Sequence, residues 1–196
     1  MLKTISHVLF CLTTMVIAGA QTPAGRITSS IDPTRLRTLS QNVHPLARAE
    51  FDHGAAPPDL PMDRMLMVLS RTAEQESALE SLLKAQQDRS SPQFRQWLTP
   101  QQFGSRFGAA DSDIQTITAW LQSQGFTVGR VSNGKTIIEF SGTAGQVQQA
   151  FHTEIHKYVV NGEEHWANAT DPQIPEALAP AMAALQHFTI SQRRRS

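Results

Sequence analysis

Two short segments carry residue types that are able to perform chemistry. The first is Ser141-Gly142-Thr143-Ala144, which follows a predicted strand and precedes a predicted helix. A hydrolase nucleophile turn needs the pattern Gly-x-Ser-x-Gly, which this segment lacks. Thr143 is followed three residues later by Gln146, a pairing typical of a capping box at the start of a helix. We therefore assign no catalytic residue to this segment.

The second segment is His152-x-Glu154-x-His156. A zinc-protease helix needs His-Glu-x-x-His, which puts both imidazoles on one helical face. In a strand, residues two apart point to the same side, so these three side chains would share one face of a sheet. That arrangement would bind a metal weakly, but it is more typical of the polar outer face of an antiparallel sheet. We predict no metal site.

The charge balance bears on possible partners. The 196 residues contain 17 Lys and Arg and 17 Asp and Glu, so the formal net charge is zero. A protein that binds nucleic acid by neutralising phosphates needs a basic excess, so we expect no nucleic-acid partner. The basic end of the chain, Arg193 to Arg195, is too short for a nucleic-acid arm. It is expected to be a solvated terminus or, in a secreted precursor, a processing point.

The N-terminus has the pattern of a secretory signal peptide over residues 1–20. Lys3 precedes an apolar run, and Ala18 and Ala20 form a small-x-small cleavage site before Gln21. A membrane anchor is the alternative, but a span needs about 20 apolar residues, more than this run supplies. We expect secretion to the extracellular space or periplasm, with no stable membrane insertion after the signal is removed. Cleavage would also remove Cys11, the only cysteine.

Residues 21–60 lack periodicity and contain several prolines, so they are expected to form an extended lead or linker. Residues 61–190 are expected to fold, and residues 191–196 to form a tail. Capping-box pairs predict three helix starts, at Thr72 with Gln75, Thr99 with Gln102, and Thr143 with Gln146.

A fourth helix is expected to begin at Asp111 or Ser112 and to end at Gly125. Trp97 and Trp120 lie at helical spacing beside Leu and Ile residues, so we expect both to pack in the core.

Strand signals complete the pattern. Met65 to Leu69 is a continuous apolar run, typical of a buried central strand. Asn133-Gly134 and Asn161-Gly162 each separate two alternating segments, which predicts two hairpins. The segment from Ile174 to Leu185 is expected to be helical, with Pro180 as an interruption.

The resulting order is strand, helices, strand, strand, helix, strand, in which residues 153–160 supply the last strand and 164–168 a short added one. It predicts an α+β fold: a ferredoxin-like antiparallel sheet with helices packed on one face. A helix pair is inserted before the second strand, and an extended N-terminal lead precedes the domain.

The stretch from Met65 to Phe188 resembles the pro-kumamolisin activation domain, the propeptide of the sedolisin (serine-carboxyl) peptidases. The resemblance rests on a linear set of motifs that are individually weak but fairly specific in this order. They are Ser91-Pro92-Gln93-Phe94-Arg95-Gln96-Trp97-Leu98-Thr99-Pro100-Gln101-Gln102-Phe103, Arg106-Phe107-Gly108, Trp120 to Phe126, Phe140 to Ala144, Ala150-Phe151 and Ile174-Pro175.

The resemblance implies a ferredoxin-like propeptide that assists folding and inhibits a sedolisin-type peptidase domain, in cis or in trans, until acid releases it. It implies no cofactor, since the family's calcium site lies in the catalytic domain. Because the chain ends at Ser196 and carries Ala144 where the family's Ser-Gly-Thr-Ser motif has its nucleophile, we expect no peptidase activity.

The inhibitory linker of the family leads toward the active-site cleft. Here it would correspond to the C-terminal stretch, with Ala179, Phe188, Arg193, Arg194 and Arg195 as the candidate residues. Three alternatives stay open at this point: a secreted ferredoxin-like binding module, a hydrolase with an unrecognised site, and a non-functional gene fragment.

Overall fold

The central sheet has the strand order of a ferredoxin-like fold. A computed structural model describes residues 22–186 and 190–191 of the chain. Its central sheet has the order β4-β5-β3-β9, with every neighbouring pair antiparallel. The strands are β3 (Pro61–Leu69), β4 (Thr127–Val131), β5 (Ile137–Thr143) and β9 (Met182–Gln186). The first and third strands are central and the second and fourth are edges, which confirms the predicted α+β class.

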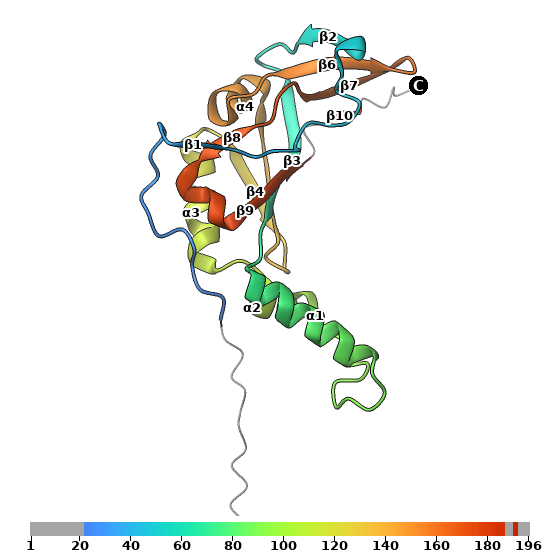
Figure 1. The fold of residues 1–196 in the computed structure, drawn as a ribbon. Coiled ribbons are helices and arrows are strands. Elements are labelled where there is room, and N and C mark those ends of the chain that lie inside the picture. Colours follow the sequence, from blue (N-terminus) through green and yellow to red (C-terminus); the bar gives the residue numbers. More distant parts are fainter. Residues whose placement is uncertain (1–21, 187–189, 192–196) are drawn as a thin grey trace, which may run out of the picture.

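Helices cover one face of this sheet. The helices α3 (Asp111–Ser123) and α4 (Ala144–Phe151) lie on its left-hand side in Figure 1. The buried side chains of the sheet point to that side and interdigitate with those of the two helices. They include Met62, Met65, Met67 and Leu69 of β3, Ile138 and Phe140 of β5, Ile117 and Leu121 of α3, and Val147 and Phe151 of α4.

Aromatic rings fill the centre of this core. The Phe126 and Phe140 ring centroids are 5.2 Å apart in an edge-to-face arrangement. Trp120 and Phe151 are 5.5 Å apart in the same geometry. Such edge-to-face pairs are preferred because the positive ring edge meets the negative ring face. The expected core position of Trp120 is therefore confirmed.

All three predicted capping boxes are present. They begin α1 (Ala73–Gln87), α2 (Pro100–Phe107) and α4, and in each the Thr hydroxyl and the Gln amide satisfy a backbone N–H. The cap predicted for α3 at Asp111 or Ser112 is wrong, because Ala110 occupies the N-cap position without a side-chain hydrogen bond. The carboxylate of Asp113 instead accepts hydrogen bonds from the backbone N–H groups of Arg26 and Ile27.

The helices α1 and α2 are the predicted inserted pair, and they project from the body as an arm (Figure 1). The loop between them contains Trp97, whose side chain is exposed. The predicted core position of Trp97 is therefore wrong. The indole lies in the loop that joins the two helices, outside the residues that form the core.

A second antiparallel sheet lies above the first in Figure 1. Its order is β10-β7-β6-β2, with β2 (Asp52–Ala55), β6 (Ile155–Val160), β7 (Glu163–Asn168) and β10 (Ile190–Ser191). The predicted β6-β7 hairpin is confirmed, with Asn161 and Gly162 both at positive φ (53° and 81°). Residues 155–160 thus belong to this sheet and do not supply the fourth strand of the first one.

The fourth strand of the central sheet is β9, in a segment where the sequence predicts helix. Only η2 (Glu176–Ala181) is helical there, and it is a 3-10 turn that contains Pro180. Proline removes a backbone donor and clashes with the preceding turn, so an α-helix does not continue through it. The residues after it, Met182 to Gln186, pair with β3 instead.

The N-terminal lead is extended but lies on the body. Its strand β1 (Leu36–Thr38) pairs with β8 (Gln173–Pro175), and the turn η1 (Ala49–Phe51) leads into β2. Ile27, Ile31 and Leu39 pack against the core. The lead thus contacts the second sheet through β2 and the core beneath the central sheet through these three side chains.

Candidate interaction surface

The face of the central sheet opposite α3 and α4 has no helix over it in the described part of the chain (Figure 1). Half-buried apolar side chains lie there in a row across three strands. Val68 of β3 is paired with Ile137 of β5 on one side and with Ala184 of β9 on the other. Leu66 lies two residues along β3 on the same face, because side chains alternate in a strand. We call Leu66, Val68, Ile137 and Ala184 the open face.

The open face corrects the prediction for the apolar run at residues 65–69. The sequence predicts a strand buried on both sides, whereas the structure fully buries Met65, Met67 and Leu69 and leaves Leu66 and Val68 partly open to solvent. An outward-facing strand position on a solvated sheet is usually polar. Apolar residues at such positions are typical of a surface that another protein covers.

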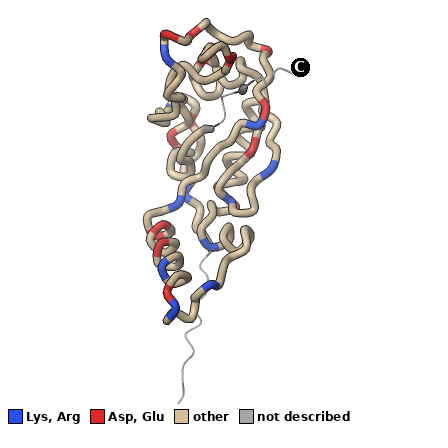
Figure 2. Tube along the Cα trace, turned by 90° about the vertical axis from the view of Figure 1, so that its right-hand side faces the viewer, with Lys and Arg blue, Asp and Glu red and all other residues tan. Residues whose placement is uncertain are grey.

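Charged residues of both signs border the open face. Glu139, which is paired with Leu66, lies 3.7 Å from Arg64. Figure 2 looks onto the right-hand side of Figure 1 and shows both signs of charge interspersed there. Such a mixture gives no single-sign field that would attract a polyanion.

The His-x-Glu-x-His segment forms a different cluster from the one expected. His152 ends α4 in the left-handed conformation, and only Glu154 and His156 come together. The His156 Nδ1 atom lies 2.9 Å from a carboxylate oxygen of Asp52, and its Nε2 atom lies 3.2 Å from Glu154. Among the described residues no group of three or more His, Cys, Asp or Glu is placed to hold a metal ion.

The two carboxylates change the pKa of the His156 ring. Partial burial alone would lower this pKa, but the hydrogen bonds and negative charges of Asp52 and Glu154 outweigh it and raise the pKa above its usual value. The pKa of Asp52 is lowered, first by the backbone N–H of Gly54 and then by His156. The cluster therefore joins β2 of the lead to β6 by a charged contact.

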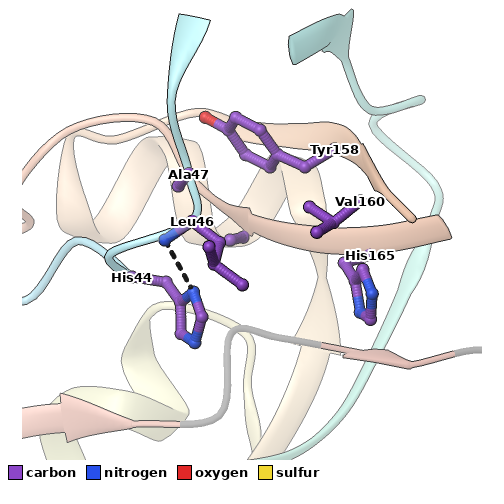
Figure 3. A pocket seen from close by; sticks show the side chains of 7 residues that line it. His44, Leu46, Ala47, Tyr158, Val160 and His165 are labelled. Atoms are coloured by element: carbon purple, nitrogen blue, oxygen red, sulfur yellow. Dashed lines mark hydrogen bonds between the residues drawn. The ribbon is translucent and has the colours of Figure 1, made fainter. Parts of the chain in front are cut away.

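A cavity of about 260 Å³ lies between the lead and the second sheet (Figure 3). Residues His44 to Ala47 form one wall and Tyr158, Val160, His165 and Ala167 the other. The lining is mostly apolar, and His44 is turned back so that its Nδ1 atom accepts a hydrogen bond from the backbone N–H of Leu46 (3.2 Å). This arrangement provides apolar contact but no nucleophile with an adjacent base.

The remaining predicted site residues are placed as follows. Ala179 lies in η2, partly buried against the core. Thr143 caps α4, so the proposed structural role of Ser141-Gly142-Thr143-Ala144 is confirmed. The signal-cleavage residues Ala18, Ala20 and Gln21, and the linker residues Phe188, Arg193, Arg194 and Arg195, lie outside the described residues. No described helix is long and apolar enough to cross a membrane.

Two features were missed by the sequence reasoning. The first is Asp52 as the partner of His156, and no local pattern identifies it, because 104 residues separate the two. The second is the open face, for which a signal existed. In the run Met65 to Leu69 the inward and the outward positions are all apolar. In the neighbouring strand β5, by contrast, the outward positions include the polar residues Glu139 and Ser141.

The fold defines a class: an antiparallel α+β domain with helices on one face of its central sheet. Comparison with known proteins agrees with this. The chain belongs to the pro-kumamolisin activation domain family, whose profile matches residues 51–189. Because the family is an activation domain of peptidases, this domain is a propeptide and not their catalytic domain.

Two curated relatives support the assignment. The chain is similar to xanthomonalisin from Xanthomonas sp. (strain T-22), with 31% identity over 169 residues, which are 86% of this chain and 20% of the relative. It is also similar to sedolisin from Pseudomonas sp. (strain 101), with 29% identity over 119 residues, which are 61% of this chain and 20% of the relative. The chain thus spans about a fifth of the length of these relatives.

Proposed function

We propose that this chain is the propeptide of a secreted sedolisin-type serine peptidase, and that it binds the peptidase domain through the open face. The observation that carries the proposal is the row Ile137-Val68-Ala184, whose apolar side chains are only partly buried, on a sheet whose other face is fully packed. Burying apolar surface drives most protein association. The partner domain lies in cis in a longer precursor or acts in trans.

In this role the propeptide assists folding of the peptidase domain and inhibits it until acid releases the complex. Histidines gain charge near pH 6 and carboxylates lose theirs near pH 4, as follows from usual pKa values of about 6.5 and 4. A chain with 17 acidic and 17 basic residues then becomes cationic. A cationic surface is repelled by a partner that becomes cationic in the same acid.

The proposal includes secretion through residues 1–20, with cleavage before Gln21. It requires no cofactor in this chain. Inhibitory contact by the C-terminal stretch, with Phe188, Arg193, Arg194 and Arg195, is part of the same proposal, because these residues follow the folded domain directly in the sequence.

The test is inhibition of a related peptidase by this chain. The catalytic domain of xanthomonalisin would be assayed with a peptide substrate, with increasing amounts of the full chain, from pH 3 up to the highest pH at which the enzyme turns over. We expect inhibition that saturates near one chain per enzyme at the upper pH and weakens toward pH 3. Undiminished tight inhibition at pH 3 would contradict acid release, and no inhibition at any pH would contradict the inhibitor role.

A further inference from the structure

Trp97 is the most exposed of the large apolar side chains in the described residues. Its side chain is 66% exposed, compared with 46% for Leu83 and 41% for Leu46. It lies in the loop between α1 and α2, at the part of the chain that the fold does not use for its core. Tryptophan is enriched at the centres of protein interfaces because it buries a large surface and keeps one hydrogen-bond donor.

The loop that carries Trp97 is held on both sides by hydrogen bonds. The side chain of Gln86, which is buried in α1, donates to the carbonyl of Gln96. The backbone N–H of Arg95 donates to the carbonyl of Gln86 (3.0 Å). The residues on either side of the indole are thus fixed to α1.

The loop is also closed on itself. The Gln96 side chain donates to the carbonyl of Pro92 (2.8 Å), and the backbone N–H of Trp97 donates to the carbonyl of Arg95 (3.2 Å). An exposed indole on a fixed backbone is pre-organised for binding, because little conformational freedom remains to be lost when a partner covers it.

The arm and the open face lie on the same side of the molecule. In Figure 1 the helices α3 and α4 lie to the left of β3, while the α1–α2 arm projects downward and to the right. A domain seated on the open face therefore extends toward the arm. The helix α1 carries three glutamates and one lysine, which disfavours a polyanion as the partner of the arm.

We propose that Trp97 is the anchor of a second contact between this chain and the peptidase domain, separate from the open face. This inference rests on the proposed function, since the partner is the same. The α1–α2 arm then positions the indole at a distance from the sheet. This contact accounts for the exposed tryptophan at position 97, which is not part of the core.

The test compares variants of the full chain for binding to the catalytic domain of xanthomonalisin, measured by calorimetry near neutral pH. We expect Trp97→Ala to weaken binding by about 30-fold, the size of a typical interface hot spot. Trp97→Phe should recover part of the loss because an aromatic ring remains. Leu46→Ala, which removes an exposed side chain outside the arm, is the matched control and should bind like the wild type. Thermal unfolding of each variant establishes that it is folded.

Each outcome decides between the two proposals. If the wild type binds and Trp97→Ala binds equally well, the anchor is wrong and the proposed function stands. If the wild type does not bind, the proposed function fails and the anchor fails with it. If Trp97→Ala abolishes only self-association in the ultracentrifuge, the partner of Trp97 is a second copy of this chain and the inference is overturned.

Discussion

The imidazole of His156 lies 2.9 Å from the carboxylate of Asp52, so a residue of the N-terminal lead forms a charged contact with the β6-β7 hairpin. The contact is only partly exposed, with Glu154 on the other ring nitrogen and the ring of Tyr158 stacked beside it. Charged and titratable groups thus surround the imidazole on both strands. Because of this contact the stability of the domain depends on pH, and the direction of the dependence follows from the pKa shifts of the two residues.

The His156–Asp52 contact should stabilise the fold most between about pH 4 and pH 6.5. The raised pKa of His156 gives stability that is fully present below the usual pKa of about 6.5 and is lost as the pH rises through the folded value. The lowered pKa of Asp52 gives stability that is present above about pH 3.9 and is lost as the pH falls through the folded value. Both contributions are complete only inside this window.

The variant Asp52→Asn tests this, because the amide oxygen still accepts the bond from the Gly54 backbone N–H. Its loss of unfolding free energy, from urea titrations at pH 2.5, 5 and 8, should be largest at pH 5, at about 1 kcal/mol or less for a partly exposed pair. The control is Glu163→Gln, an exposed residue whose partner His165 is 3.9 Å away. An equal loss for Asp52→Asn at all three pH values would refute the assignment.

Charged residues on the open face should abolish partner binding without unfolding the chain. Leu66→Asp combined with Val68→Asp puts two carboxylates where the proposal buries apolar surface, while in the free domain both sites are partly open to solvent. We expect binding to the xanthomonalisin catalytic domain to fall by at least about 100-fold, with circular dichroism unchanged. The control is Ala119→Asp on the exposed side of α3, the helix that covers the opposite face of the sheet. Retained binding by the double variant would place the interface elsewhere.

Removing the Asp113 carboxylate should release the start of the lead. Asp113 is 1% exposed and accepts bonds from the backbone N–H groups of Arg26 and Ile27. Asp113→Ala leaves these donors without a partner, which should cost about 2–3 kcal/mol in urea unfolding. The control is Asp111→Ala, which removes only a surface ion pair with Lys135 and should cost at most about 1 kcal/mol. Equal losses for the two variants would contradict the role of Asp113.

The two faces of the central sheet should respond differently to truncation. Phe140→Ala empties a site that is 1% exposed and packed against Phe126, so it should cost about 3–5 kcal/mol of unfolding free energy. Leu66→Ala on the opposite face should cost less, about 1–2 kcal/mol, because its side chain is only partly buried. Comparable losses would mean that the open face is not open in solution.

Local signals in the sequence predicted local structure well. The three Thr/Gln capping boxes and the Asn161-Gly162 turn depend on residues three or fewer positions apart, and all four are present. The core position of Trp120 followed from its helical spacing. These features require no knowledge of the tertiary fold.

Features that depend on distant partners were not predictable. Met182 to Gln186 form β9 because β3 offers them a free edge, although their spacing suits a helix. Trp97 has the same helical spacing as Trp120, yet its exposure is set by the position of the arm. The His156–Asp52 contact joins two segments whose pairing only the folded sheet reveals.

The measurement that tests the central claim most directly is a calorimetric titration of a sedolisin-type catalytic domain with the full chain, at neutral pH and again at pH 3. The account predicts a complex of one chain to one domain at neutral pH and much weaker binding at pH 3. No heat of binding at either pH, with both proteins folded, would contradict the claim that this domain is a propeptide that binds its peptidase.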